Sequence, residues 1–349
     1  MRTSAIGRTS LYLSIRYFAK RKQVDAIITK YLGENVSQEK KSHLKKMMRK
    51  AMIKYRWDFN EFFMFHFEDI DDEKRKSYVP EFDKNIFCDL INEPKEADVF
   101  LDKWNTYKHY LEFFKRDIFN IRSISDIDSQ ECTNFISKHN RFMLKPVYEA
   151  LGRGILIIDQ EKNKNVKSEL KNIFNSGVNA FVLEELIIQN PQMAKLHPSS
   201  VNTLRIRTVN VNGTIRFIHP SLRIGRANAF IDNAGAGGIM GNVDIDSGIV
   251  YDACDKLGNR YEYHPDTNVK IIGFKVPRWE EALETAQKMA LKNPSVRYVG
   301  WDMALSKDNG WVMVEGNDKG QWGFQYVRQE GFRDQMNAIL RELGKKEIK

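Results

Sequence analysis

The dipeptide Asn309-Gly310 separates two apolar, strand-like runs near the C-terminus, residues 299–305 and 311–315. Asn-Gly is typical of a two-residue hairpin turn, because both central residues of that turn have positive φ angles. The alternation of large apolar residues with small or polar ones on both sides fits strands that have one buried face. The sequence therefore predicts a tight β-hairpin at this position.

The predicted register places three oxygen-bearing side chains on one face of the hairpin. With the Asn-Gly dipeptide as the whole loop, Asp302 faces Asn317 and Ala304 faces Glu315. Since successive strand residues point to opposite faces, Asp302, Glu315 and Asn317 emerge together. Two carboxylates and an amide oxygen suit Mg²⁺, which takes one or two protein carboxylates and completes its shell with water and substrate phosphates. We therefore predict a magnesium site that serves a nucleotide.

A solvent-exposed hairpin whose outer face is merely polar is the alternative. Trp301, Met303 and Leu305 make the opposite face apolar, and Gly316 lies between two of the candidate ligands. An apolar face of this size favours a hairpin that is buried beside a site.

Composition limits the class of protein. The chain has 349 residues and is 42% apolar, enough for two or three packed units. Cys88, Cys132 and Cys254 lack the spacing of a disulfide framework or a zinc site. No run of about 18 apolar residues and no secretory signal is present. We expect a cytoplasmic protein, and peripheral contact with the inner face of a membrane stays open.

Positive charge is concentrated at the N-terminus. Residues 1–56 hold 15 lysines and arginines but only three acidic residues, whereas the whole chain has a net charge of +9. Basic amphipathic helices are expected at residues 24–32 and 43–55. These helices could contact an anionic membrane or a polyanionic glycan, with nucleic acid not expected as the main partner. A solvated helical face is an equally open interpretation.

Three regions are expected along the chain. Residues 1–97 are predicted as a basic, mostly helical region, in which the aromatic stretch 57–67 is core. Residues 98–200 are predicted as a compact α+β unit, and residues 201–349 as an antiparallel sheet that ends in the hairpin. The expected helices span residues 95–114, 166–175, 278–292 and 324–343, and the expected strands span residues 141–146, 154–159, 180–188, 203–211 and 214–224.

A phosphate-binding loop is the next feature to seek. The chain has no P-loop pattern, and the glycines of residues 235–241 miss the dinucleotide-binding spacing. Lys145 ends a predicted strand, and Gly152, Arg153 and Gly154 follow it. Glycines let backbone N–H groups approach phosphate oxygens, so this segment is the candidate phosphate loop.

These elements, in this order, resemble the ATP-grasp superfamily over residues 98–330. The resemblance is carried by the Asp102-Lys103 pair, Lys145-Pro146 with its glycine loop, residues 184–187, and the ending Asp302 with Glu315-Gly-Asn317. Residues 201–205, 222–225 and 232–238 resemble the sugar-transfer-associated branch. The resemblance implies an α+β ATP-grasp fold, in which two α+β subdomains grip ATP.

The resemblance also implies roles for individual residues. Lys103 and Lys145 would contact the α and β phosphates, and Gly152, Arg153 and Gly154 would cover the triphosphate. Glu184 would accept a hydrogen bond from the adenine amino group, and the backbone of Glu185, Leu186 and Ile187 would bind the adenine edge. Gln189 or Asn190 would lie near the ribose. Asp302, Glu315 and Asn317 match the magnesium ligands. Arg205 and Arg223 match catalytic positions that face the transferred phosphoryl group and the acyl phosphate, and Asn233 lies in the nearby asparagine- and glycine-rich segment.

The two arginines raise a question of register. If Asn212 and Gly213 form a two-residue turn, Arg223 opposes Asn202 and lies on the face opposite to Arg205. Either a β-bulge resets the alternation, or only one of the two arginines faces the site.

The reaction implied is ligation of a carboxylate to an amine, with ATP and Mg²⁺ as cofactors, an acyl-phosphate intermediate and ADP as a product. The branch implies an amino acid or similar acid joined to an amino group on a sugar, as in polysaccharide biosynthesis. Two alternatives stay open. One is a ligase with a peptide or protein acceptor, and the other is a non-catalytic, nucleotide-regulated module that binds polyanions.

Overall fold

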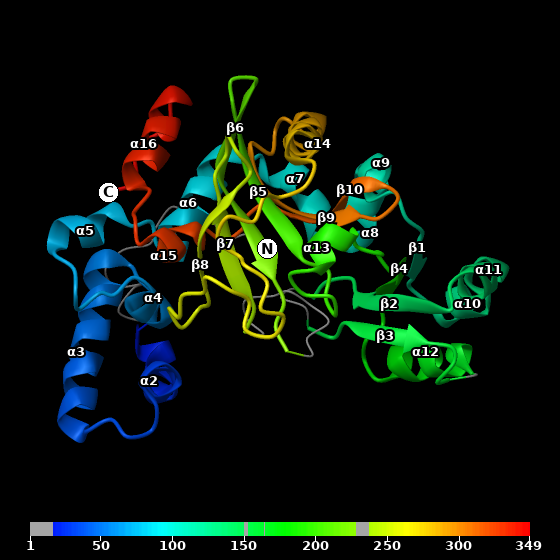
Figure 1. The fold of residues 1–349 in the computed structure, drawn as a ribbon, viewed down its shortest axis with the longest axis horizontal. Coiled ribbons are helices and arrows are strands. Elements are labelled where there is room, and N and C mark those ends of the chain that lie inside the picture. The colour runs from blue at the N-terminus through cyan, green and yellow to red at the C-terminus, as the bar shows by residue number, and fades with distance from the viewer. Residues whose placement is uncertain (1–16, 150–152, 164, 228–236) are drawn as a thin grey trace.

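The computed structural model describes residues 17–149, 153–163, 165–227 and 237–349. Two antiparallel sheets and a helical N-terminal region make up a mixed α+β fold (Figure 1). Gly152 and Asn233, both predicted site residues, lie outside the described residues.

The N-terminal helices have an aromatic core. They are η1 (Arg21–Gln23), α2 (Val24–Leu32), α3 (Gln38–Tyr55), α4 (Phe59–Met64), α5 (Asp72–Ser77) and α6 (Glu81–Ile91). Trp57, Phe62 and Phe67 are buried in one cluster that also holds Tyr326 and Val327 from the C-terminal part of the chain. The prediction that residues 57–67 are core is therefore confirmed. The helical region is thereby packed against the remainder of the fold.

The single helix predicted for residues 95–114 is wrong. The segment is divided into α7 (Pro94–Ala97), η2 (Asp98–Leu101), α8 (Lys103–His109) and α9 (Leu111–Phe114). The carboxylate of Asp102 accepts hydrogen bonds from the N–H groups of Trp104 and Asn105, so it caps a new helix. Lys103 consequently becomes the first residue of α8.

The smaller sheet has the order β1-β4-β2-β3. Its strands are β1 (Ile118–Ile121), β2 (Arg141–Pro146), β3 (Leu156–Asp159) and β4 (Phe181–Glu185). The helices α10 (Ile124–Asp128), α11 (Gln130–Lys138) and α12 (Val166–Asn175) lie at the same end of the molecule (Figure 1). The predicted bounds of β2 and α12 are confirmed, whereas β3 and β4 are shorter than the runs 154–159 and 180–188.

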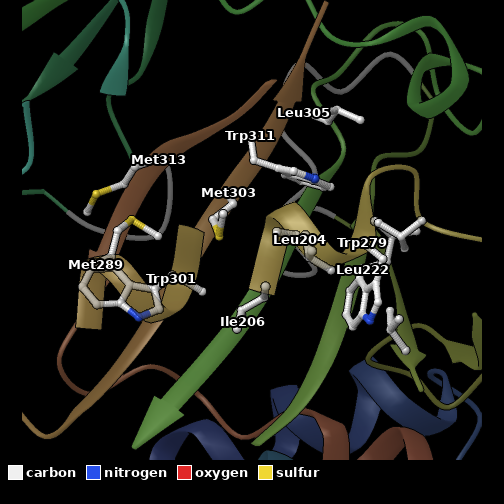
Figure 2. Packing of buried hydrophobic residues seen from close by; sticks show 14 of the residues in the cluster. Leu204, Ile206, Leu222, Trp279, Met289, Trp301, Met303, Leu305, Trp311 and Met313 are labelled. Carbon is white, nitrogen blue, oxygen red and sulfur yellow. The ribbon is translucent and has the colours of Figure 1, made fainter. Parts of the chain in front are cut away.

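The larger sheet has the order β10-β9-β5-β6-β7-β8. Its strands are β5 (Thr203–Val211), β6 (Thr214–Ile224), β7 (Ile239–Val243), β8 (Val250–Cys254), β9 (Tyr298–Ser306) and β10 (Gly310–Asn317). The helix α13 (Pro191–Ala194) precedes the sheet, and α14 (Trp279–Lys292) follows β8. Side chains of α14 join the cluster that Trp301, Met303 and Leu305 form on one face of β9 (Figure 2). The apolar face predicted for the hairpin is confirmed.

The hairpin turn differs from the prediction. Ser306 pairs with Gly310, so three residues form the loop, and Gly310 alone of the Asn-Gly dipeptide has a positive φ, 70°. A register shift between Met313 and Glu315 then brings Glu315 opposite Asp302. The predicted pairings of Asp302 with Asn317 and of Ala304 with Glu315 are therefore wrong. Because the turn and the bulge compensate each other, the three predicted ligands still share one face.

A second irregularity answers the question about the arginines. Asn212 and Gly213 have φ angles of 52° and 92°, as the predicted two-residue turn requires. Arg207 pairs with Ile218, but Arg205 pairs with Ser221, so His219 and Pro220 together oppose a single residue of β5. Proline cannot donate to the ladder, which favours a bulge here. The bulge places Arg223 opposite Thr203, on the same face as Arg205.

The C-terminal helix is also divided. The predicted helix over residues 324–343 consists of α15 (Phe324–Arg328) and α16 (Arg333–Glu342), because Gln329 adopts a left-handed conformation with φ of 54°. A side chain at Gly331 would come within 2.2 Å of the backbone of Ser77, so the chain approaches α5 closely at this point. Among the described helices, none combines the length and the apolar character that crossing a bilayer would need.

Candidate functional site

A cleft of about 990 Å³ is lined by residues from both sheets and from the N-terminal helices. Most predicted site residues that the structure describes line it. They are Lys103, Lys145, Arg153, Glu184, Glu185, Leu186, Ile187, Gln189, Arg205, Arg223, Asp302, Glu315 and Asn317. Residues more than 200 positions apart in the sequence therefore meet in one cavity.

Asp302 is the centre of an ion-pair network on the floor of the cleft. Its carboxylate accepts hydrogen bonds from Arg205 Nε at 2.5 Å and Nη2 at 2.6 Å, and from Arg223 Nη1 at 2.9 Å. The side chain is almost fully buried. Burial alone would raise the pKa of Asp302, but the two guanidinium groups outweigh it and hold the pKa at about 2. Asp302 is therefore ionised at neutral pH.

Glu315 and Asn317, on β10, lie beside Asp302, which is on β9. The Asn317 amide donates to Glu315 Oε1 at 2.8 Å, and the Glu315 side chain is exposed to the cleft. Asp302, Glu315 and Asn317 offer oxygen ligands on this face. A carboxylate has about four acceptor positions, and Asp302 uses three of them for hydrogen bonds, so one is left for a cation. The donor set therefore fits a hard divalent cation such as Mg²⁺.

Lys145 is held by a buried carboxylate. Its ammonium group lies 2.7 Å from Glu184 Oε2, while Arg116 Nη2 lies 2.5 Å from Glu184 Oε1. Burial alone would raise the pKa of Glu184. The charges of Arg116 and Lys145 outweigh burial and hold the pKa below its usual value, so the carboxylate stays ionised. The expected contact of this carboxylate with adenine stays a prediction. In the structure the carboxylate holds the ammonium group of Lys145.

Lys103 points from the start of α8 toward the same region. Its ammonium group donates to the carbonyl oxygens of Glu149, at 2.5 Å, and Val147, at 3.4 Å. Burial lowers the pKa of Lys103, and the neighbouring charge of Lys145 lowers it too, whereas Glu315 opposes the shift. The two lysines and Glu315 are thus near enough to influence one another. An anionic ligand between the lysines would relieve their repulsion.

The candidate phosphate loop is described only at its end. Gly154 has φ of 70°, and a side chain there would place Cβ 2.9 Å from Cγ of Pro146. Both facts require glycine at this position. Arg153 lines the cleft with an exposed side chain. The loop end is therefore packed directly on the residue that follows Lys145.

The segment after β4 crosses from one sheet to the other. Leu186 and Ile187 follow the last residue of β4, and both line the cleft. That their backbone groups bind the adenine edge stays a prediction. Asn190 does not line the cleft and instead caps α13 through a bond to the Gln192 N–H. Gln189 is committed to the carbonyl oxygens of His197 and Ser200.

Sequence reasoning missed two arginines. Arg207 is 1% exposed, donates to the carbonyl oxygens of Gln321 and His219, and lines the cleft. Arg207 lies two residues after Arg205 on a predicted strand, so the alternation of side chains along a strand could have placed both arginines on one face. Arg116 precedes β1 as an isolated arginine, and nothing in the local sequence pattern indicates its pairing with Glu184.

The family described as sugar-transfer associated ATP-grasp matches residues 84–341. No curated protein sequence matches the chain.

Similar solved structures include the ATP-grasp ligase PsnB complexed with a minimal precursor, at 10% identity and a TM-score of 0.44, with 75% of this chain and 70% of that chain covered. They also include D-alanyl-alanine synthetase A from Vibrio cholerae, at 11% identity and a TM-score of 0.42, with 68% and 67% covered. A third is N5-carboxyaminoimidazole ribonucleotide synthetase from Thermotoga maritima, at 12% identity and a TM-score of 0.42, with 73% and 52% covered. Since the family match extends over most of the chain, the chain belongs to the sugar-transfer associated ATP-grasp family.

Proposed function

We propose that this protein is an ATP- and Mg²⁺-dependent ligase that joins a carboxylic acid to an amine and releases ADP and phosphate. The acid would be an amino acid or a similar compound, and the amine would be an amino group on a sugar or a polysaccharide precursor. Membership of the family supports the ATP-grasp chemistry, and the family's description supports the sugar.

One observation carries the proposal. Lys103 is on α8, Lys145 is on β2 of the smaller sheet, and Arg205 and Arg223 are on the larger sheet. All four line the same cleft as the oxygen ligands of β9 and β10. Transfer of a phosphoryl group requires mainly positioning and charge stabilisation. A cleft with cations along its length and an oxygen-lined cation site fits a bound triphosphate better than it fits a neutral ligand.

The chemistry proceeds in two displacements. A carboxylate oxygen of the acid attacks the γ-phosphorus of ATP, the bond from that phosphorus to the bridging oxygen breaks, and ADP leaves. The amine then attacks the carbonyl carbon of the acyl phosphate, the carbon–oxygen bond to phosphate breaks, and the amine loses a proton. Arg205 and Arg223 are the groups we expect to neutralise charge on the transferred phosphoryl oxygens.

Asp302, Glu315 and Asn317 would hold Mg²⁺ in this proposal. A bound Mg²⁺ would offset the negative charge of the triphosphate. We keep Gly152 and Asn233 as proposed phosphate-loop and phosphoryl-site residues, although they lie outside the described part of the chain. The division at residues 97 and 200 is likewise kept as a proposal.

The test uses hydroxylamine as a general amine, because it converts an acyl phosphate to a stable hydroxamate. The protein is incubated with ATP, Mg²⁺, pooled amino acids and hydroxylamine, and ADP and hydroxamate are measured. In parallel, pooled amino sugars replace hydroxylamine and condensation products are sought by mass spectrometry. We expect acid-dependent ADP release and a hydroxamate.

Glu315→Gln is the decisive variant, because this exposed side chain is not needed to neutralise a buried charge. It should lower turnover by about 10²-fold or more while the melting temperature is unchanged. Glu131→Gln, an exposed change on α11 outside the cleft, is the matched control and should keep full activity. Equal activity in both variants would refute the metal assignment.

A further inference from the structure

The cleft extends beyond the residues used so far, to a wall formed by the N-terminal helices. Lys30 and Tyr31 of α2 and Asn60 of α4 line this end, together with Lys256 from the segment after β8. The first three lie outside residues 84–341, which the family matches. This end of the cleft is therefore built partly by a segment that the family does not define.

Lys256 has no partner of its own in the described part of the chain, where no hydrogen bond or ion pair reaches its ammonium group. The neighbouring Asp255 does not serve it, because that carboxylate accepts hydrogen bonds from Tyr261 and from the side chain and backbone of Asn259. Burial lowers the pKa of Lys256, the charges of Lys30 and Arg223 lower it further, and only the more weakly acting Glu81 opposes the shift. Three cations thus face the same end of the cleft.

Lys30 also lacks a carboxylate partner among the described residues. Its ammonium group donates to Asn60 Oδ1 at 3.2 Å and lies 4.9 Å from the centre of the Tyr31 ring. The Tyr31 hydroxyl donates to the same Asn60 oxygen at 3.4 Å. One neutral amide oxygen therefore supports both side chains, and the charge of Lys30 is not compensated.

The acidic residues at this end are already committed to other groups. Asp58 pairs with Lys20 at 2.6 Å, and Glu81 pairs with Lys84 at 2.6 Å. Glu61 accepts hydrogen bonds from the backbone N–H groups of Asp58 and Glu81. Lys256 is half-buried, so an uncompensated charge there is costly, whereas Lys30 is exposed and adds positive charge beside it. The two lysines therefore favour a ligand that supplies negative charge.

We propose that Lys30 and Lys256 form a subsite for a second anionic group on the substrate acid, so that the preferred acid carries a carboxylate or a phosphate in addition to the carboxylate that reacts. The proposal rests on the proposed function. The reacting carboxylate lies beside Arg205 and Arg223, and the second group lies toward the wall formed by α2 and α4. The N-terminal helices thereby select the substrate.

The test measures binding, so that it needs no turnover. The full-length protein is saturated with Mg²⁺ and a non-hydrolysable ATP analogue at constant ionic strength. Butyrate, succinate and 3-phosphonopropionate are titrated by calorimetry, since they have similar lengths but differ in the second group. We expect one of the two dianionic acids to bind at least about tenfold more tightly than butyrate, as a charged hydrogen bond allows. The two dianionic acids distinguish a carboxylate subsite from a phosphate subsite.

Lys256→Met and Lys30→Met should each lower the affinity for the preferred dianionic acid by about tenfold and leave the affinity for butyrate and for nucleotide unchanged. Lys256→Arg should retain most of the preference, because it keeps the charge. Lys46→Met is the control, since Lys46 is an exposed residue of the neighbouring basic helix α3 and does not line the cleft. It should change nothing.

The proposal is overturned if succinate and 3-phosphonopropionate bind no more tightly than butyrate. It is also overturned if the preference survives in both Met variants, or if Lys46→Met weakens it equally, which would indicate general attraction of anions. Failure of the ligase proposal is a separate result. In that case the preference for a dianionic acid persists in this assay while no acid gives hydroxamate or ADP.

Discussion

Arg205 and Asp302 face each other across β5 and β9 and are joined by two hydrogen bonds, of 2.5 and 2.6 Å, in a nearly solvent-free position. Arg223 makes a third bond to the same carboxylate. The pair therefore has a structural role in addition to its proposed catalytic one, because removal of the acid would leave two arginines without their shared partner.

Asp302→Ala should lower the free energy of unfolding by about 3–5 kcal/mol, since it leaves buried charges uncompensated. Glu342→Ala removes a similar two-bond partner from Arg216, but both members of that pair are about half exposed. Its cost should be much smaller, because water screens an exposed ion pair. Urea denaturation of both variants measures the difference. Similar costs would mean that the buried network contributes no special stability.

Lys145→Met should lower the rate of ADP formation by about 10²-fold or more, because it removes one cation from the proposed phosphate site. Glu184 would keep Arg116 as a partner, so the fold should persist. Lys138→Met, which removes an exposed lysine paired with Asp117, is the control. Steady-state kinetics with varied ATP should show a normal rate for the control. An unchanged rate for Lys145→Met would remove this lysine from the site.

His219 should make stability depend on pH. Burial and then the charge of Arg328, which donates to His219 Nδ1 at 3.0 Å, lower its pKa from 6.5 to about 4. Between these values the unfolded chain binds more protons than the folded chain, so stability falls as the pH drops from 6.5 to 4.

His219→Asn tolerates the positive φ of 34° at this bulge and removes the titrating group. Denaturant titrations from pH 4 to 7 should give a shallower dependence of the free energy of unfolding on pH in the variant than in the parent protein. Parallel curves would mean that the folded and unfolded states bind this proton equally.

Gly154→Ala should cost more stability than Gly177→Ala. Both glycines have positive φ angles, 70° and 106°, so each change should cost about 1 kcal/mol through backbone strain. Only at Gly154 would the new Cβ also meet Pro146, at 2.9 Å, whereas the space at Gly177 is open. Because that proline follows Lys145, Gly154→Ala should also raise the KM for ATP. Equal losses of stability would mean that the proline ring moves aside freely.

Local patterns in the sequence predict many elements of this fold. The bounds of β2, β5, β6 and α12 follow from alternation, apolar periodicity and the Asn212-Gly213 turn, all of which act between near neighbours. Breaks inside helical patterns were harder to predict. The cap that Asp102 forms is a local side-chain signal that apolar periodicity does not contain, and the close approach of Gly331 to Ser77 depends on packing between distant segments.

The candidate site was predictable as a set of residues but not as a geometry. The three oxygen ligands share a face, yet the register that brings Glu315 opposite Asp302 depends on a bulge that the Asn-Gly signal does not reveal. The contributions of Arg116 and Lys30 could not be predicted, because Arg116 acts through Glu184, 68 positions away, and Lys30 contacts Asn60, 30 positions away. Pro220 within a strand pattern was a signal for the second bulge.

The extra residue at His219 and Pro220 has a consequence for how this protein can change over evolutionary time. This extra residue puts Arg223 on the same face of the sheet as Arg205. Loss or gain of one residue between the Asn212-Gly213 turn and Arg223 would therefore turn that arginine to the opposite face. Strand β6 can therefore accept many replacements of one amino acid by another, but its length should be invariant among relatives that retain activity.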